Sequence, residues 1–498
     1  MKMSRVIAIT VLMAVASTTF VLAQSAKLSC TQLSLNQGKS KAIKVLNTSK
    51  KVKWGIIGKK YVTLKVKGNK AIIKAGKKTG TCYVKATIGK KVLKCKVTVK
   101  PIPKPIKEVE NYEELTQNIK KGSVVNRKPD QEFEESVSDV SVGLLQYLQS
   151  HDKAKNILIS PDSILTAMAM TENGAQGNTL TEMEAVFGLP IGSMNKYLNY
   201  VNENLKLNVS VKYYLANSIW FKKNDMNMKE DFLKRNVDYF SSQIFKAPFN
   251  NSTVSAINGW VYKNTDKTIS KIVDKLDSGS AAVILNAVVF EGEWSEKYDD
   301  ATKLPFKYEN GTTKKVDMLC GKEDAYINVN GADGFVKPYK GGRVSFVGLE
   351  TPKGMTVDNF VSSLKGSDFV EAFNNISYEY DVYTKMPKFK YDYDTSLVEA
   401  FKSLGMKDAF DKYNANFNGM AYLKPGENLK IDEIRHKTHI ELDENGTKAT
   451  AATAVSIFKL TGMPVEKESV EVDLDHPFVY AIIDEYGTPL FIGVLKTV

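Results

Sequence analysis

The stretch that decides the fold is Glu444-Asn-Gly-Thr-Lys-Ala-Thr-Ala-Ala-Thr-Ala-Val-Ser-Ile-Phe-Lys-Leu-Thr461. Between residues 447 and 454 every side chain is small except that of Lys448. Such a segment is too apolar for an ordinary flexible linker and too small for a core strand. Its composition suits a segment with two states: an exposed loop, and a strand that slides between strands already in place.

Alternate side chains of a strand point to opposite faces of its sheet. In the inserted state, the inward side chains would be those of Thr447, Ala449, Ala451, Thr453 and Val455. Lys448 falls on the other face, where solvent accommodates its charge. A plain hairpin connection with little sequence bias is the alternative interpretation.

The flanking segments are Ile434-Arg-His-Lys-Thr-His-Ile-Glu-Leu-Asp443 before the stretch, and Asp473-Leu-Asp-His-Pro-Phe-Val-Tyr-Ala-Ile482 and Pro489-Leu-Phe-Ile-Gly493 after it. Together with the small-residue stretch they resemble the reactive-centre loop and C-terminal signature of the serpins. The earlier matches occur in the family's order: Asn156-Ile-Leu-Ile-Ser-Pro-Asp-Ser-Ile164, Asn258-Gly-Trp-Val-Tyr262 with Thr265 and Thr268-Ile-Ser-Lys-Ile272, Leu285-Asn-Ala-Val-Val-Phe-Glu-Gly-Glu-Trp294, Met386-Pro-Lys-Phe389 and Leu404-Gly-Met-Lys-Asp-Ala-Phe410.

The resemblance covers residues 133–498 and implies a suicide inhibitor of serine, and of some cysteine, endopeptidases. A protease attacks the bait bond and forms an acyl-enzyme, and the cleaved loop then inserts into the central sheet. Counting 16 positions after Glu444 places the bait residue at Leu460 and the bond at Leu460–Thr461. Lys459 is the alternative, since some members have loops one residue shorter. The segment after the bond is longer than is usual in the family.

The resemblance also assigns supporting residues. The hinge of the loop comprises Glu444, Gly446, Thr447, Ala449, Ala451, Ala452 and Thr453. The shutter cluster, where the sheet must part, comprises Ser160, Ser163, Asn286 and His436. The breach, where the loop first inserts, comprises Trp294, Lys388 and Glu444, with a Lys388–Glu444 pair that holds the hinge until cleavage.

A search for enzyme motifs supports this interpretation. The sequence contains no HExxH, CxxC, Walker, Rossmann or Gly-x-Ser-x-Gly pattern. His436 and His439 are three residues apart, and on a strand this spacing points them to opposite faces. We therefore predict that the chain is not an enzyme, and we expect it to bind neither a cofactor nor a metal.

The N-terminus reads as a targeting segment. Lys2 and Arg5 precede an apolar run that ends at Leu22, and Val21-Leu-Ala23 offers a signal-peptidase site. A retained membrane anchor is the alternative. We expect residues 1–23 to be a signal peptide and the protein to be secreted, extracellular or attached to the cell surface.

The next segment has an unusual charge. Residues 25–107 contain 23 Lys, no Arg and no acidic residue, within a chain whose net charge is +13. This break in composition marks a domain boundary. Outside the cell, such a domain would meet anionic wall polymers, acidic glycans or lipid headgroups rather than nucleic acid. A merely solvated lysine-rich face is the alternative.

Alternating polar and apolar residues predict a small β-sandwich in this basic segment. Trp54, Lys77-Lys-Thr-Gly-Thr81 and the closing Cys95-Lys-Val-Thr-Val99 resemble the bacterial group-2 Ig-like domain. A turn at Ile88-Gly89 would place Val84 opposite Leu93 and Cys82 opposite Cys95. We therefore predict a Cys82–Cys95 disulfide, with Cys30 as an alternative partner for either and three buried thiols as the other interpretation.

The predicted organisation is multidomain: a signal peptide (1–23), an all-β Ig-like domain (24–100), a proline-rich linker (101–130) and an α+β serpin domain (131–498). The last should hold three β-sheets, eight or nine helices and an exposed loop. From Phe133 a helical apolar face is expected, made by Val137, Val140, Val142, Leu144, Leu145 and Leu148. Expected partners are proteases of the chymotrypsin, elastase or subtilisin type, with a monomeric inhibitor. A non-inhibitory serpin whose basic domain binds a cell surface or glycan is the alternative.

Overall fold

The computed structural model describes residues 25–58, 60–100, 112–153, 155–222, 227–277, 279–424, 427–447 and 467–498. The chain divides into two units, Met1–Lys107 and Glu108–Val498, and each is described by itself. Within the described residues, no helix is both long enough and apolar enough to cross a membrane. The expected signal peptide (1–23) lies outside the described residues.

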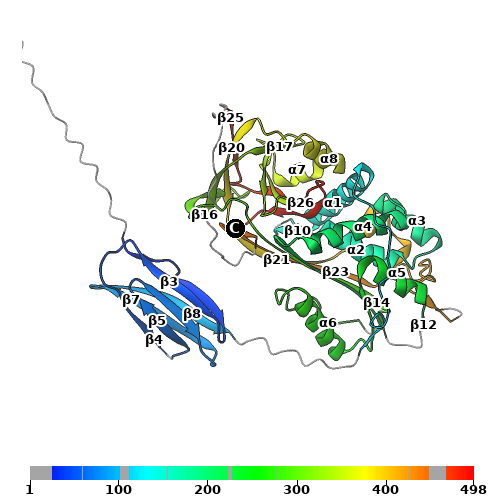
Figure 1. Cartoon of the computed structure of the whole chain (residues 1–498), viewed down its shortest axis with the longest axis horizontal. Helices are drawn as coiled ribbons and strands as arrows, with labels where there is room; N and C mark the ends of the chain where they lie inside the picture. The colour runs from blue at the N-terminus through cyan, green and yellow to red at the C-terminus, as the bar shows by residue number, and fades with distance from the viewer. Residues whose placement is uncertain are drawn as a thin grey trace, which may run out of the picture. The chain divides into compact units, whose positions relative to one another are not determined.

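The first unit is a sandwich of two four-stranded sheets (Figure 1). One sheet has the order β1-β3-β6-β5 and the other β2-β8-β7-β4. Their inward side chains form one apolar core, which includes Ile43, Ile73, Val84 and Val97. The strand bounds are β1 (Lys27–Leu28), β2 (Gln32–Asn36), β3 (Ser40–Leu46), β4 (Lys53–Ile57), β5 (Val62–Lys67), β6 (Lys70–Ala75), β7 (Gly80–Ile88) and β8 (Lys91–Lys100).

The predicted disulfide of this unit is wrong. Cys82 pairs across the hairpin with Val97, and Cys95 pairs with Val84. The turn residues are Gly89 and Lys90, because Ile88 already pairs with Lys91 and Gly89 takes the left-handed conformation (φ 58°). The register is therefore offset by two residues from the predicted one, so Cys82 and Cys95 do not face each other and both are free thiols.

The thiol of Cys95 has another neighbour. Cys30 lies between β1 and β2 and packs against the same core. Burial, together with the smaller effects of the adjacent Cys30 and Cys82 thiols, raises the pKa of Cys95 to about 12. Cys30 is also a free thiol in this structure.

A seven-stranded sheet dominates the second unit, with the order β21-β23-β24-β14-β11-β13-β9. β23 and β14 are parallel to each other, and β24 lies antiparallel between their ends. The expected linker region (101–130) contributes its described part to this unit, since β9 pairs with β13 at the sheet edge. The bounds are β9 (Glu113–Glu114), β11 (Val211–Lys222), β13 (Gln243–Ala247), β14 (Ala282–Glu293), β21 (Phe389–Ser396), β23 (Glu433–Asp443) and β24 (Gly446–Thr447).

Two further large sheets complete the β-structure of this unit. A six-stranded sheet contains β10 (Ile157–Ile159), β27 (Pro489–Leu495), β26 (Phe478–Asp484), β19 (Val344–Leu349), β18 (Ala332–Pro338) and β17 (Ala325–Val329) in that order. A four-stranded sheet contains β15 (Thr302–Lys307), β16 (Thr313–Glu323), β20 (Tyr380–Pro387) and β25 (Glu468–Asp473). β12 (Asn227–Met228) and β22 (Ala421–Tyr422) form a two-stranded ribbon.

Nine α-helices occur in the described part of this unit, as expected. They are α1 (Gln131–His151), α2 (Pro161–Glu172), α3 (Gly177–Phe187), α4 (Ile191–Leu207), α5 (Glu230–Phe240), α6 (Asn251–Asn264), α7 (Val357–Ser363), α8 (Gly366–Asn374) and α9 (Val398–Leu404), with a 3-10 turn at Asp408–Phe410. The carboxylate of Asp130 caps α1 by accepting from the backbone N–H of Phe133. The predicted apolar face of α1 is confirmed, because all six of its aliphatic positions are buried.

Helices cover both faces of the seven-stranded sheet (Figure 1). All residues of α2 are buried, and α2 packs against β11, β14 and β27. On the opposite face, Ile257 and Val261 of α6 share a core cluster with Leu285 and Val289 of β14. β14 is therefore buried on both faces, which explains its almost uninterrupted apolar sequence.

Candidate functional site

The candidate site is the place where β24 lies between β14 and β23. Thr447 pairs with Gly292 of β14 on one side and with Leu442 of β23 on the other. Gly446 continues both ladders, pairing with Glu293 and Asp443. Gly446 and Thr447, where the small-residue run begins, are therefore already a short strand of the central sheet.

Beyond β24, β14 and β23 pair directly with each other. The parallel register runs from Val283↔Glu433 to Val289↔His439. A strand that extended β24 would have to replace these backbone hydrogen bonds. It would be antiparallel to both neighbours, and antiparallel pairing is slightly more stable per residue than parallel pairing.

An aromatic stack anchors the breach. The Trp294 ring lies 4.5 Å from that of Tyr339, centroid to centroid, with the planes 15° apart. The hydroxyl of Tyr339 is 2.6 Å from Oγ1 of Thr447, and both side chains are buried. Trp294 also donates from Nε1 to the carbonyl of Asp443 (3.0 Å) and from its backbone N–H to Asn445 (2.9 Å). The start of the hinge is thus held by side chains far away in sequence.

Two glycines allow this close packing. A Cβ on Gly292 would lie 2.8 Å from the Tyr339 ring. A Cβ on Gly446 would lie 2.0 Å from the carbonyl oxygen of Gly292, and Gly446 has a positive φ of 148°. Gly446 is therefore required both for the backbone conformation and for the space.

The Lys388–Glu444 ion pair expected at the breach is present, and the two side chains are partly exposed. Burial would raise the pKa of Glu444, but the Lys388 ammonium outweighs it and holds the pKa below its usual value. A second, buried pair lies beneath: Lys337 Nζ is 2.6 Å from Glu323 Oε1 and 4.2 Å from the centre of the Tyr298 ring. Sequence reasoning missed this pair, because its residues lie on β16 and β18.

The four expected shutter residues are brought together and are fully buried. Asn286 Nδ2 donates to the carbonyl and Oγ of Ser163, both at 2.6 Å. His436 Nε2 accepts from the backbone N–H of Ser160 at 3.2 Å, and its Nδ1 contacts Asn286 Oδ1. The cluster links β14 directly to β23 and ties both strands to the start of α2.

The contacts of His436 define its protonation state. Because Nε2 accepts a hydrogen bond, the proton of the neutral ring must lie on Nδ1, which donates to Asn286 Oδ1. Burial lowers the pKa of His436 to about 3. His439 lies on the opposite face, as its spacing predicts, where Nδ1 is 2.5 Å from Asp392 Oδ1.

This assignment predicts a pH-dependent stability. Unfolding should take up a proton wherever the pH lies between about 6.5, the ordinary pKa of histidine, and about 3. The stabilisation from His436 is then complete above pH 6.5 and is lost as the pH falls, by about 1.4 kcal/mol per pH unit. We expect the difference in unfolding free energy between the wild type and His436→Gln to shrink by about 2 kcal/mol from about pH 7.5 to about pH 5.

Urea titrations at the two pH values would measure this difference. Ser163→Ala is the matched control, because it removes a member of the same cluster that does not titrate. Its difference from the wild type should be the same at both pH values. An equally constant difference for His436→Gln would contradict a neutral, buried imidazole.

The polar cluster extends further than the sequence indicated. Asn217 of β11 accepts from Asn286 Nδ2 (2.6 Å) and donates to Ser163 O (3.0 Å). Tyr213 donates to Asp162 Oδ2 (3.0 Å), and burial raises the pKa of Asp162 to about 7. These residues escaped detection because polar residues inside buried elements have no local sequence signal.

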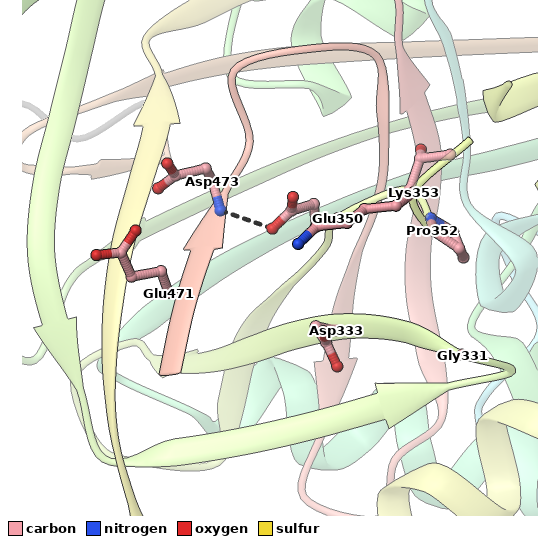
Figure 2. Close-up of a pocket in the computed structure, with 8 residues that line it drawn as sticks. Gly331, Asp333, Glu350, Pro352, Lys353, Glu471 and Asp473 are labelled. Carbon is pink, nitrogen blue, oxygen red and sulfur yellow. Dashed lines mark hydrogen bonds between the residues drawn. The ribbon is translucent and has the colours of Figure 1, made fainter. Parts of the chain in front are cut away.

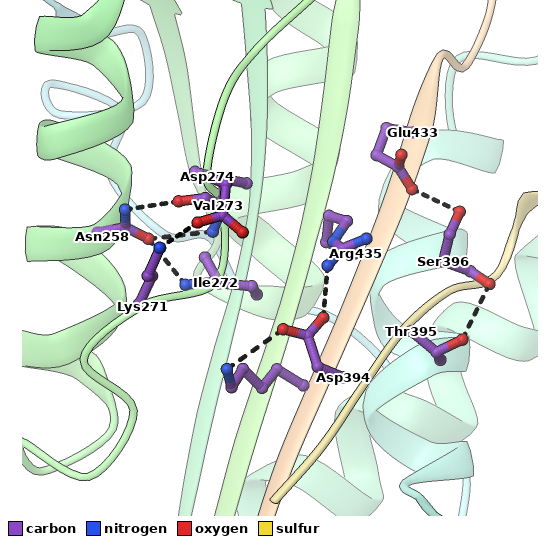
Figure 3. A network of polar contacts seen from close by, with 11 residues as sticks. Asn258, Lys271, Ile272, Val273, Asp274, Asp394, Thr395, Ser396, Glu433 and Arg435 are labelled. Atoms are coloured by element: carbon purple, nitrogen blue, oxygen red, sulfur yellow. Dashed lines mark hydrogen bonds and ion pairs between the residues drawn. The ribbon is translucent and has the colours of Figure 1, made fainter.

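The segment after α6 crosses the outer face of the sheet (Figure 3). Asn258 fixes it: Oδ1 accepts from the backbone of Ile272 (2.8 Å) and Val273 (3.1 Å), and Nδ2 donates to the carbonyl of Val273 (2.8 Å). On the neighbouring strands, Asp394 pairs with Arg435 (2.6 Å) and Lys437 (3.2 Å). An inserting strand would have to pass beneath the Asn258-bound segment.

A separate acidic pocket of about 460 Å³ lies beside β25, the strand that follows the loop (Figure 2). Asp333, Glu350, Glu471 and Asp473 line it together with Lys353. Glu350 accepts from the backbone N–H of Asp473 at 2.9 Å, and burial raises the pKa of Glu350. The pocket gives this end of the unit a concentration of carboxylates.

Several predicted residues lie outside the described residues. These are the hinge residues Ala449, Ala451, Ala452 and Thr453 and the candidate reactive residues Lys459, Leu460 and Thr461. Of the hinge, the structure describes Glu444, Gly446 and Thr447, which lie at the breach beside Trp294.

Known proteins with similar sequences and structures include serpins. The family model "Serpin (serine protease inhibitor)" matches residues 135–497. An uncharacterized serpin-like protein of Thermococcus kodakarensis is 31% identical over 348 residues, covering 68% of this chain and 80% of its own. Leukocyte elastase inhibitor A of Mus musculus is 29% identical, covering 68% and 92%. The crystal structure of a thermophilic serpin, tengpin, in its native state aligns with a TM-score of 0.72 at 37% identity, covering 78% of this chain and all of that one.

Proposed function

The chain belongs to the serpin family, and from this premise we propose that it is a suicide inhibitor of serine, and of some cysteine, endopeptidases. The protein would act as a substrate that traps the protease, rather than as an enzyme. The observation that carries the proposal is β24: the hinge already occupies the sheet at the breach, between two parallel strands that pair directly below it.

The proposed reaction begins as ordinary proteolysis. The serine Oγ of the protease attacks the carbonyl carbon of Leu460, and its proton passes through the catalytic histidine to the leaving nitrogen of Thr461. The Leu460–Thr461 bond breaks, and Leu460 remains bound as an ester. Insertion of the freed loop carries the acylated protease away and distorts its catalytic geometry before water can hydrolyse the ester.

The register of β24 predicts how insertion would continue. Extended from Thr447, the strand places Ala449 between Phe290 and Ile440. Two residues later, Ala451 comes between Val288 and Thr438. Both positions face the core above α2, where close packing leaves room only for small side chains. This register gives a physical reason for the alanines of the stretch.

The same register brings Thr453 between Asn286 and His436. Insertion would then separate these two side chains and break the hydrogen bond that now joins β14 to β23. A threonine hydroxyl both donates and accepts, so Thr453 could bond to both separated groups. Before cleavage, the hydrogen bond between Asn286 and His436 would link β14 to β23 at the shutter. After cleavage, Thr453 of the inserted loop would link the two strands instead.

A large apolar residue at the bait position suits the chymotrypsin, elastase or subtilisin type of protease. If the bond instead follows Lys459, the target is of the trypsin type. A non-inhibitory serpin is the second candidate, and the hinge argues against it: Thr447 and residues 449–454 are all Ala or Thr rather than bulky, charged or proline residues.

Incubation of the full chain with chymotrypsin, elastase, subtilisin and trypsin tests the proposal. We expect an SDS-stable complex with at least one of the first three, and release of a C-terminal fragment that begins at Thr461. Mass spectrometry of that fragment identifies the bond. Complete cleavage without a complex at every enzyme ratio would refute inhibition.

The basic N-terminal unit has a separate proposed role. We infer that it is a bacterial Ig-like domain, supported by its two four-stranded sheets and by Trp54, and that export brings it to an anionic surface outside the cell. Attachment to an anionic polymer or glycan is favoured by one observation, the 23 lysines without any acidic residue in residues 25–107.

A further inference from the structure

The lysines of the first unit have no neutralising partners within it. Residues 25–107 contain no acidic residue, so no carboxylate side chain of this segment can neutralise their ammonium groups. Like charges directly opposite on neighbouring strands destabilise a sheet. Lysines that lie opposite one another on neighbouring strands therefore indicate a surface that binds an anionic partner.

One end of the sandwich carries a basic pocket of about 700 Å³. Lys60, Lys77 and Lys78 line it together with Gln37, Tyr61 and Thr79. These residues come from three connections, between β2 and β3, between β4 and β5, and between β6 and β7. All three lysines are exposed, so their ammonium groups are accessible to a ligand.

The pocket is held in place by contacts between its loops. The side-chain amide of Gln37 donates to the carbonyl of Lys77, and the N–H of Gly76 donates to the carbonyl of Tyr61 (2.8 Å). The Tyr61 ring packs over Gly80, where a Cβ would lie 2.4 Å from the ring. A ligand would thus meet a preformed site, which reduces the ordering cost of binding.

From the pocket, exposed lysines continue over the outer face of the β1-β3-β6-β5 sheet. Lys74 comes first, because it pairs with Thr63 near the pocket end of β5, and Lys65 follows. At the far end, Lys67, Lys70 and Lys44 lie directly opposite one another on three adjacent strands. From Thr63 to Lys67 the strand advances about 14 Å, so the surface is longer than a single small anion.

We propose that this pocket and face bind a linear polymer that carries a phosphodiester in each repeat, with one phosphate in the pocket. The inference rests on the proposed attachment role of this unit and is independent of protease inhibition. Lysine binds a phosphate oxygen as a point charge, whereas planar carboxylate recognition favours arginine, which residues 25–107 lack. The concave pocket fits a chain of charged groups better than a flat lipid surface.

Fluorescence anisotropy with labelled poly(glycerol phosphate), a linear phosphodiester polymer, as the probe tests the proposal on the full chain. We expect the wild type to bind, and to bind more weakly as NaCl rises from about 50 to 200 mM, because phosphate binding releases counterions. The triple variant Lys60→Gln/Lys77→Gln/Lys78→Gln should raise the Kd about tenfold or more. Thermal unfolding of each variant checks that the unit remains folded.

The matched control is Lys53→Gln/Lys94→Gln/Lys96→Gln, which removes the same charge from the outer face of the β2-β8-β7-β4 sheet. Its Kd should rise less than about threefold. Equal weakening by both triple variants would mean that net charge alone binds the polymer, and would overturn the site. Tighter binding to polyglutamate or to phosphatidylglycerol vesicles than to poly(glycerol phosphate) would overturn the ligand class. Absence of binding by the wild type to all three probes would refute the attachment role itself and leave inhibition untouched.

Discussion

Replacing Thr447 with arginine is expected to convert the proposed inhibitor into an ordinary protease substrate. In the structure the Thr447 side chain is 1% exposed, and its hydroxyl contacts the hydroxyl of Tyr339 beside Trp294 of the breach. An arginine here would place an unpaired charge against the Trp294–Tyr339 stack, which costs several kcal/mol. β24 would not form, and insertion would lose its first step.

The yield of complex depends on the rate of loop insertion relative to the rate at which the acyl-enzyme is hydrolysed. Each 1.4 kcal/mol added to the insertion barrier slows it about tenfold. Thr447→Arg should therefore lower the yield of SDS-stable complex at least about tenfold, with a matching rise in cleaved, inactive chain. Gel densitometry after incubation with the reactive protease measures both products.

Lys448→Arg is the control for this experiment. It adds no charge, and in the proposed register the side chain of residue 448 points to the opposite face from Thr447. Complex yield should stay at the wild-type level. Full complex yield from Thr447→Arg would contradict the proposal that the loop inserts through the breach.

Leu460→Arg is expected to change which protease is trapped. The primary specificity pocket of a serine protease reads the residue before the bond, and an apolar pocket cannot accept an unpaired guanidinium. The variant should form complex with trypsin, while complex formation with chymotrypsin slows by about two orders of magnitude or more. Association rates with both proteases, measured by progress curves, give the two effects.

Lys459→Ala distinguishes the two candidate bonds. If the bond is Leu460–Thr461, this variant should keep its reaction with chymotrypsin. The bait residue is Lys459 if Lys459→Ala forms no complex and Leu460→Arg leaves the protease preference unchanged. The loop between Glu444 and the bait residue is then one residue shorter. The released fragment then begins at Leu460 instead of Thr461.

Sequence patterns predicted the elements whose signal is local. The apolar face of α1 follows from helical periodicity, and the opposite orientation of His436 and His439 follows from the strand period of two. The shutter residues were found through ordered motifs, because each belongs to a segment with a recognisable sequence. In contrast, the register of the β7–β8 hairpin was predicted wrongly, since the position of Gly89 within the turn decides it.

The sequence by itself determined that the side chains of residues 447–454 are small except that of Lys448, and that strand spacing puts Lys448 on the face opposite Thr447 and Ala449. Only the tertiary structure decided where that stretch joins the central sheet, because Gly292, Tyr339 and Leu442 come from three segments that are far apart in the sequence. The same holds for the basic pocket, whose lysines converge from separate loops. Composition and periodicity are properties of neighbouring residues, whereas contacts between distant residues depend on how the strands are ordered and registered.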